Sequence, residues 1–117
     1  MLLEQVGSDM DIGYERNISY NGKLDSENNR FWTDDEGLYH REDGPAFMFN
    51  NGDVNNWVIH GLHHRIDGPA IEYNMGDNYD EFFIHGEQIT FEEWKEYLIN
   101  KSGLPTNEVT RLILKYS

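Results

Sequence analysis

Histidines near carboxylates are the residues of this 117-residue chain that could carry out chemistry. Asp43 lies three positions after His40, and Asp67 three positions after His64. A carboxylate can orient a histidine as a general base, so His64 with Asp67 or Asp43 is one candidate hydrolase site. Two histidines and a carboxylate could also hold a metal ion. No nucleophile or catalytic motif accompanies them, and we predict a non-enzymatic protein with no cofactor and no metal.

Arginines beside the same histidines support a second alternative, a protein that binds or sequesters a nucleotide-like small ligand. A guanidinium can fork two phosphate oxygens, which Arg41 and Arg65 could do with help from Arg16. The net charge of the chain argues against an anionic ligand. The residues of this alternative site are His40, Arg41, Asp43, His64, Arg65 and Asp67.

Acidic side chains dominate the composition, with 22 Asp and Glu against 9 Lys and Arg, for a formal net charge of −13. A field of this sign repels nucleic acid and anionic membranes and attracts basic protein surfaces. We expect repeated loops to array the carboxylates along one edge, where they could imitate a phosphate backbone. The predicted contact residues are Asp34, Asp35, Glu36, Asp77, Asp80 and Glu81.

An internal repeat organises the middle of the chain, because residues 61–70 nearly copy residues 37–46. Apolar residues alternate after each copy, which predicts short strands joined by turns at Asn51-Gly52 and Met75-Gly76-Asp77. The Asp-Gly-Pro-Ala element predicts a structural corner at which each arginine pairs with its own aspartate or stacks on an aromatic ring. One buried face is expected to hold Phe47, Phe49, Trp57, Ile59, Ile71, Tyr73, Phe82 and Ile84.

The last 28 residues change to helical spacing. Thr90 and Glu93 form a capping box, and Gly103 and Pro105 end the first helix. A second helix is predicted after Thr106. The expected fold is α+β: an antiparallel β-meander of tandem hairpin repeats followed by two C-terminal helices. It forms a single domain over 1–117, with a degenerate strand region at 1–30, hairpin repeats at 31–89 and a helical pair at 90–117.

The Gly-Leu-x-His-Arg-x-Asp-Gly-Pro-Ala units at 37–46 and 61–70 resemble a repeat of uncharacterised bacteriophage and large-virus proteins. They are also loosely similar to MORN repeats, from which the His-Arg-x-Asp-Gly-Pro-Ala corners and the 24-residue period depart. The resemblance covers 31–86. It implies stacked hairpins, a viral origin and a binding or scaffolding role, and it carries over no catalytic residue.

These features together predict a phage-encoded interaction protein that binds, and inhibits, a host defence or nucleic-acid-binding protein with a basic surface. We expect it in the cytoplasm of the host cell, because it has no cysteine, signal peptide or long apolar run. It should contact neither nucleic acid nor membrane directly, and exist as a monomer or homodimer.

Overall fold

The computed structural model describes residues 22–76 and 79–117, and it is α+β, with short antiparallel strands followed by two C-terminal helices. The turn residue Asp77, the side chain of Arg16 and most of the predicted degenerate region at 1–30 lie outside the described residues. The strands are β1 (Arg30–Phe31), β2 (Phe47–Phe49), β3 (Val54–Asn56), β4 (Val58–Ile59), β5 (Leu62–His63), β6 (Ile71–Tyr73), β7 (Phe82–Ile84) and β8 (Glu87–Ile89), and the helices are α1 (Phe91–Asn100) and α2 (Thr106–Tyr116).

The largest sheet has four antiparallel strands in the order β1-β2-β3-β6. β2 and β3 form a hairpin in which Met48 lies opposite Asn55. Its turn has positive φ at Asn50, Asn51 and Gly52, a conformation that asparagine and glycine adopt most readily. The turn predicted at Asn51-Gly52 is therefore confirmed.

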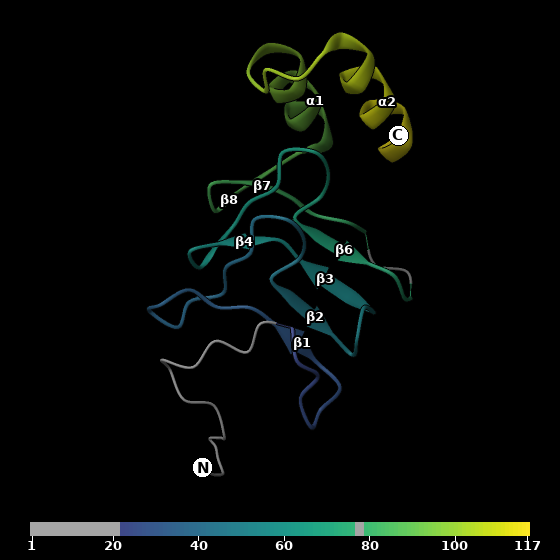
Figure 1. Cartoon of the computed structure of the whole chain (residues 1–117). Coiled ribbons are helices and arrows are strands. Elements are labelled where there is room, and N and C mark those ends of the chain that lie inside the picture. The colour runs from purple at the N-terminus through teal and green to yellow at the C-terminus, as the bar shows by residue number, and fades with distance from the viewer. Residues whose placement is uncertain (1–21, 77–78) are drawn as a thin grey trace.

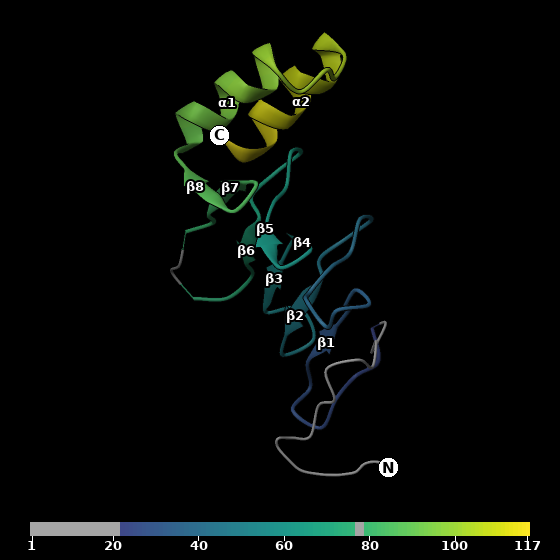
Figure 2. The ribbon, with the colours of Figure 1, turned by 90° about the vertical axis from the view of Figure 1, so that its left-hand side faces the viewer.

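Small hairpins form a second ladder beside this sheet. β4 pairs with β5 and β7 with β8, and Thr33 bridges to Tyr39. Their ladder continues from one hairpin to the next, because the N–H of Gly61 donates to the Tyr39 carbonyl and the N–H of Gly86 to the His63 carbonyl. Figures 1 and 2 show the strands in succession from β1 towards the helices, which cover the far end beyond β7 and β8.

The single buried face expected from the alternation is not formed. Phe49 is 47% exposed, and in β4 the buried residue is Val58, at 3% exposure, while Trp57 and Ile59 on either side of it are half-buried. Both faces of residues 57–59 are apolar, and the Arg65 side chain covers the Trp57 ring from the solvent side. Within the described residues, the strands also divide into one four-stranded and two two-stranded sheets instead of one continuous meander.

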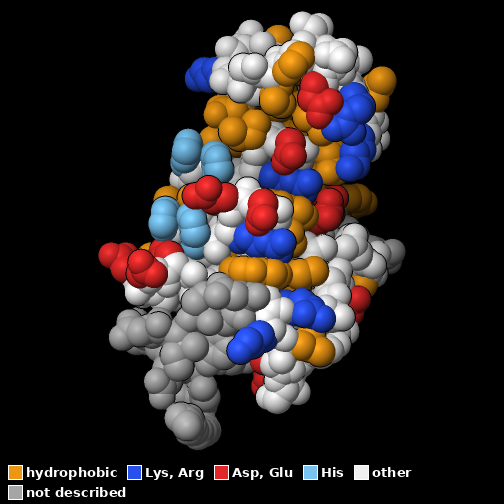
Figure 3. Space-filling model, viewed as in Figure 1, with side chains coloured by type: hydrophobic (Ala, Val, Ile, Leu, Met, Phe, Trp, Pro, Cys, Tyr) orange, Lys and Arg blue, Asp and Glu red, His pale blue; other side chains and the backbone are white. Residues whose placement is uncertain are grey.

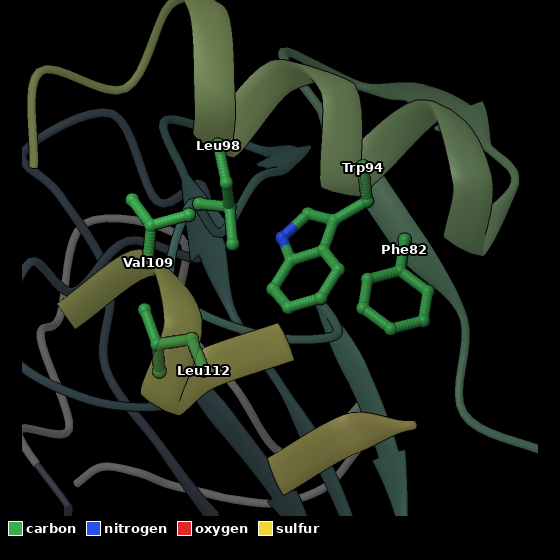
Figure 4. Packing of buried hydrophobic residues seen from close by; sticks show 5 residues of the cluster. All are labelled: Phe82, Trp94, Leu98, Val109 and Leu112. Atoms are coloured by element: carbon green, nitrogen blue, oxygen red, sulfur yellow. The ribbon is translucent and has the colours of Figure 1, made fainter. Parts of the chain in front are cut away.

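The main core lies where the helices meet the last hairpin. Phe82, Trp94, Leu98, Val109 and Leu112 pack together (Figure 4), and Trp94 is fully buried. The Trp94 indole N–H donates to the Ile66 carbonyl at 2.8 Å, which ties α1 to the second corner. The predicted capping box is confirmed, since the Glu93 N–H donates to Thr90 Oγ1 and the Thr90 N–H to Glu93 Oε1.

Candidate functional site at the two corners

The two arginines of the near-copies make the same contacts. Arg41 stacks on Trp32 at 3.9 Å from the ring centroid, and its Nε donates to Asp43 at 2.9 Å. Its Nη1 donates to the Pro45 carbonyl at 3.2 Å. Both contacts predicted for the corner arginine, with its own aspartate and with an aromatic ring, are confirmed here.

The second corner repeats this geometry with a closer ring stack, a shorter bond to the proline carbonyl and more burial. Arg65 lies 3.7 Å from the Trp57 ring centroid, and its Nε donates to Asp67 at 3.0 Å. Its Nη1 donates to the Pro69 carbonyl at 3.0 Å, and its side chain is only 13% exposed. Nε and Nη1 of each guanidinium are thus used within its own corner, which leaves fewer of its N–H groups to fork a phosphate.

The corner glycines make room for these arginines. A Cβ added at Gly44 would lie 2.8 Å from the Arg41 guanidinium carbon, and one at Gly68 would lie 2.8 Å from that of Arg65. Such distances are shorter than ordinary Cβ contacts, so any other residue would force the stacked arginine to shift. Glycine therefore favours this close packing through its lack of a side chain, since neither position has a positive φ.

Four of the five histidines stack in two equivalent pairs. Histidine side chains gather on one side of the molecule in Figure 3. The rings of His40 and His60 lie 3.9 Å apart, and those of His64 and His85 lie 4.3 Å apart. The backbone N–H of His60 donates to His40 Nδ1 at 3.0 Å, and that of His85 donates to His64 Nδ1 at 2.9 Å. These bonds hold the two-residue turns at His60-Gly61 and His85-Gly86, where both residues have positive φ, against the preceding hairpin.

This geometry is unsuited to a general base. Nδ1 of His64 accepts a backbone hydrogen bond, so the proton of the neutral ring is on Nε2 and no lone pair remains for a substrate. Burial, and next the neighbouring His85, lower the pKa of His64, which favours that neutral form. Asp67 is bound by Arg65 and does not orient the imidazole. The proposed His64–carboxylate pair is not formed.

A metal site finds no support either. Among residues 22–76 and 79–117, no three His, Asp or Glu side chains are placed to hold one ion.

The predicted acidic edge is divided by the fold. The turn over 34–38 and the segments 74–76 and 79–81 lie on opposite sides of the molecule in Figure 1. Asp34 is a structural residue with a side chain only 10% exposed: its Oδ1 accepts from the N–H groups of Glu36 and Leu38, and its Oδ2 contacts His60 Nδ1 at 2.8 Å. The hydrogen bond with His60 is the largest cause of its lowered pKa.

The other acidic residues of that prediction differ in whether their carboxylates are already hydrogen-bonded. Asp80 Oδ1 accepts from the Tyr73 N–H, and Glu81 accepts from the Tyr73 hydroxyl at 2.7 Å. Asp35 and Glu36 are exposed at the tip of their turn. Of the described residues in the set, these two remain the clearest candidates for a partner contact.

An open groove of about 750 Å3 connects the two corners with the loop between α1 and α2. It brings together five of the six alternative site residues, Arg41, Asp43, His64, Arg65 and Asp67, while His40 is not among its lining residues. Three lining carboxylates are strongly exposed: Glu42 at 82%, Asp43 at 87% and Asp67 at 64% of the side chain.

Apolar side chains complete this corner groove, and the sequence did not point to all of them. Its apolar lining includes Trp57, Ile59, Ile66 and Leu104. Glu42 lies inside the first near-copy, where the second copy has Ile66. This difference between the copies is the sequence feature that could have identified Glu42. Leu104 comes from the helix connection, and nothing in its local sequence indicates a contact with residues some 40 to 60 positions earlier.

Comparison of the chain with protein-family models, curated proteins and solved structures finds no match. Neither helix in the described part of the chain has the length and apolar character that crossing a bilayer requires.

Proposed function

We propose that this protein is a non-enzymatic, acidic interaction protein that binds a basic segment of a partner protein in the corner groove. The observation that carries the proposal is the composition of that groove: exposed Glu42, Asp43 and Asp67 beside an apolar lining. A lysine- or arginine-containing segment could place its methylene stems on the apolar side chains and its charges against the carboxylates. The formal net charge of −13 would steer such a partner towards the protein.

The wider proposal includes the origin and architecture of the chain. We infer that 31–89 consists of tandem hairpin repeats of a MORN-like kind, which the equivalent contacts of Arg41 and Arg65 support. The resemblance to phage and large-virus repeats makes an intracellular host protein the expected partner, and its inhibition the expected result. The exposed tip at Asp35 and Glu36 is a second acidic contact for the same partner.

The groove is tested with a fluorescently labelled peptide that alternates lysine and leucine, and with an acidic peptide of the same length. Fluorescence anisotropy should detect binding of the basic peptide but not of the acidic one, and the affinity of the protein for the basic peptide should decrease as salt is added. Glu42→Lys should weaken binding about fivefold at low salt, as expected for an exposed charge at an interface rim. Glu92→Lys is the matched control, because Glu92 is 77% exposed on α1 and does not line the groove.

Equal losses in the Glu42→Lys and Glu92→Lys variants would mean that the peptide responds only to net charge, and the groove proposal would then be wrong. The tip is tested separately with an Asp35→Lys/Glu36→Lys double variant, which leaves the structural Asp34 intact. Affinity purification from a host lysate with wild-type protein and the Glu42→Lys variant, followed by mass spectrometry, then identifies a partner whose retention depends on the groove.

A further inference from the structure

A second pocket, of about 430 Å3, lies where the strands meet the helices and is separate from the corner groove. Among the described residues it is lined by Tyr73 of β6, Tyr79, Asp80, Phe82 of β7, Phe91 of α1 and Tyr116 of α2. Five of these six residues are aromatic, the sixth is a carboxylate, and none is a lysine or arginine. Its volume is within the range of small-molecule sites.

The aromatic rings of this pocket stand at different angles around it. Phe82, which is 8% exposed, lies 5.8 Å from Phe91 at an interplanar angle of 55°. Tyr116 lies 6.5 Å from Phe82 and is nearly perpendicular to it, at 89°. Rings in several orientations can present both faces and edges to one guest, as in the aromatic cages that hold quaternary ammonium groups.

The polar groups of the pocket are arranged to favour a cation. The Tyr73 hydroxyl donates to Glu81 Oε2, which fixes that ring and places a second carboxylate beside it. Asp80 Oδ1 accepts from the Tyr73 N–H, while within 22–76 and 79–117 no hydrogen-bond donor reaches its Oδ2. A positive guest would therefore meet a carboxylate in addition to the negative ring faces.

Two rings of the pocket already attract ammonium groups of the chain itself. Lys95 Nζ lies 5.2 Å from the Phe91 ring centroid, and Lys115 Nζ lies 5.1 Å from that of Tyr116. Both distances are within the range of a cation–π contact. Neither lysine lines the pocket.

From this arrangement we propose that the pocket binds a methylated or quaternary ammonium group. The ligand class is an alkylammonium cation, supplied either by a small molecule such as choline or by a methylated lysine side chain of a protein. The proposal goes beyond the basic-segment function, because the site shares no residue with the corner groove and does not depend on it.

The test is an NMR titration of 15N-labelled protein with choline and, in parallel, with 3,3-dimethylbutan-1-ol, a neutral molecule of the same shape. Choline at millimolar concentrations should shift the Trp94 indole N–H signal, since that ring lies 4.8 Å from Phe82 and 5.8 Å from Tyr116. The neutral analogue should bind at least tenfold more weakly. A trimethyllysine peptide and its unmethylated counterpart distinguish the two sources: preference for the methylated peptide over choline indicates a protein ligand, and the reverse a small molecule.

Variants assign the binding to this pocket. Tyr79→Ala should weaken choline binding about three- to tenfold, as expected for loss of one ring, and should not unfold the protein because Tyr79 is 89% exposed. Asp80→Asn keeps the acceptor for the Tyr73 N–H but removes the charge, and it should weaken choline and not the neutral analogue. Phe49→Ala is the control, an exposed aromatic residue outside the pocket.

The proposal is overturned if choline causes no shift, if the neutral analogue binds equally well, or if Tyr79→Ala binds choline like the wild type. The Glu42→Lys variant should bind choline normally, and Tyr79→Ala should bind the basic peptide normally. Failure of this pocket is thereby distinguished from failure of the corner groove.

Discussion

Replacing Arg65 by lysine should destabilise the protein much more than the same change at Arg41. Both arginines contact a tryptophan, an aspartate and a proline carbonyl in equivalent ways, and Arg65 in addition lies near Tyr116 and Glu72. Lysine keeps the charge but loses the planar fork and the stacked guanidinium face. At Arg65 the change removes the 3.7 Å stack on Trp57 and one of two bonds to acceptors at 3.0 Å, in a side chain that is 13% exposed.

The magnitude follows from these contacts. A hydrogen bond that involves a charged group contributes about 1.5–3 kcal/mol, and a partly desolvated cation–π contact about 1 kcal/mol. Since lysine recovers part of both, we expect Arg65→Lys to lower the free energy of unfolding by about 2–3 kcal/mol. At Arg41, with 26% exposure and a longer bond to the Pro45 carbonyl, about 1 kcal/mol is expected.

The assay is equilibrium unfolding in urea, followed by the fluorescence of the three tryptophans. Arg111→Lys is the matched control, because Arg111 is 58% exposed and pairs with Glu108 on the surface of α2. It should leave the midpoint of the urea transition almost unchanged. Equal effects at Arg65 and Arg111 would refute the view that the corners are held by guanidinium stacking and forked hydrogen bonds.

Further predictions concern the histidine pairs, the corner glycine and the helix cap. The pKa of His64 is lowered in the folded protein, so the unfolded chain binds a proton first as the pH falls below the ordinary value of 6.5. The difference in free energy of unfolding between the wild type and His64→Gln should therefore be constant above that pH and become smaller below it, as measured by urea unfolding. Gly68→Ala should cost about 2–3 kcal/mol because its Cβ would meet the Arg65 guanidinium, whereas Gly103→Ala, with open space and φ of 75°, should cost about 1 kcal/mol in the same assay. Thr90→Ala should cost about 1 kcal/mol and increase amide hydrogen exchange in the first turn of α1; unchanged exchange would contradict the capping role.

The sequence predicted local contacts correctly where a motif contains both interaction partners. The capping box at Thr90, the Asn51-Gly52 turn and the pairing of each corner arginine with its aspartate all involve residues a few positions apart. Their geometry depends on short-range hydrogen bonds, so residue type and spacing suffice to predict them.

Burial and the candidate site depended on contacts between distant segments, and there the predictions were less accurate. Alternation cannot say which side of an apolar strand faces inward. Val58 is the buried residue, whereas Trp57 lies on the other side, where Arg65 stacks on its ring. Asp34 has the composition of a surface acid, yet it is held by His60, 26 residues later. Leu104 reaches the corner groove only through the packing of the helices.

The packing of the last hairpin against Trp94 also affects where a further hairpin could be inserted into the chain. Phe82 occupies the place that Trp32 and Trp57 hold in the earlier corners, but its neighbours are Trp94 and Tyr116 instead of an arginine. A duplicated 24-residue module inserted between the two corners would meet the same surfaces above and below, whereas one added after Phe82 would have to displace the helices. The packing would therefore accommodate an added module more readily in the interior of the chain than at this boundary.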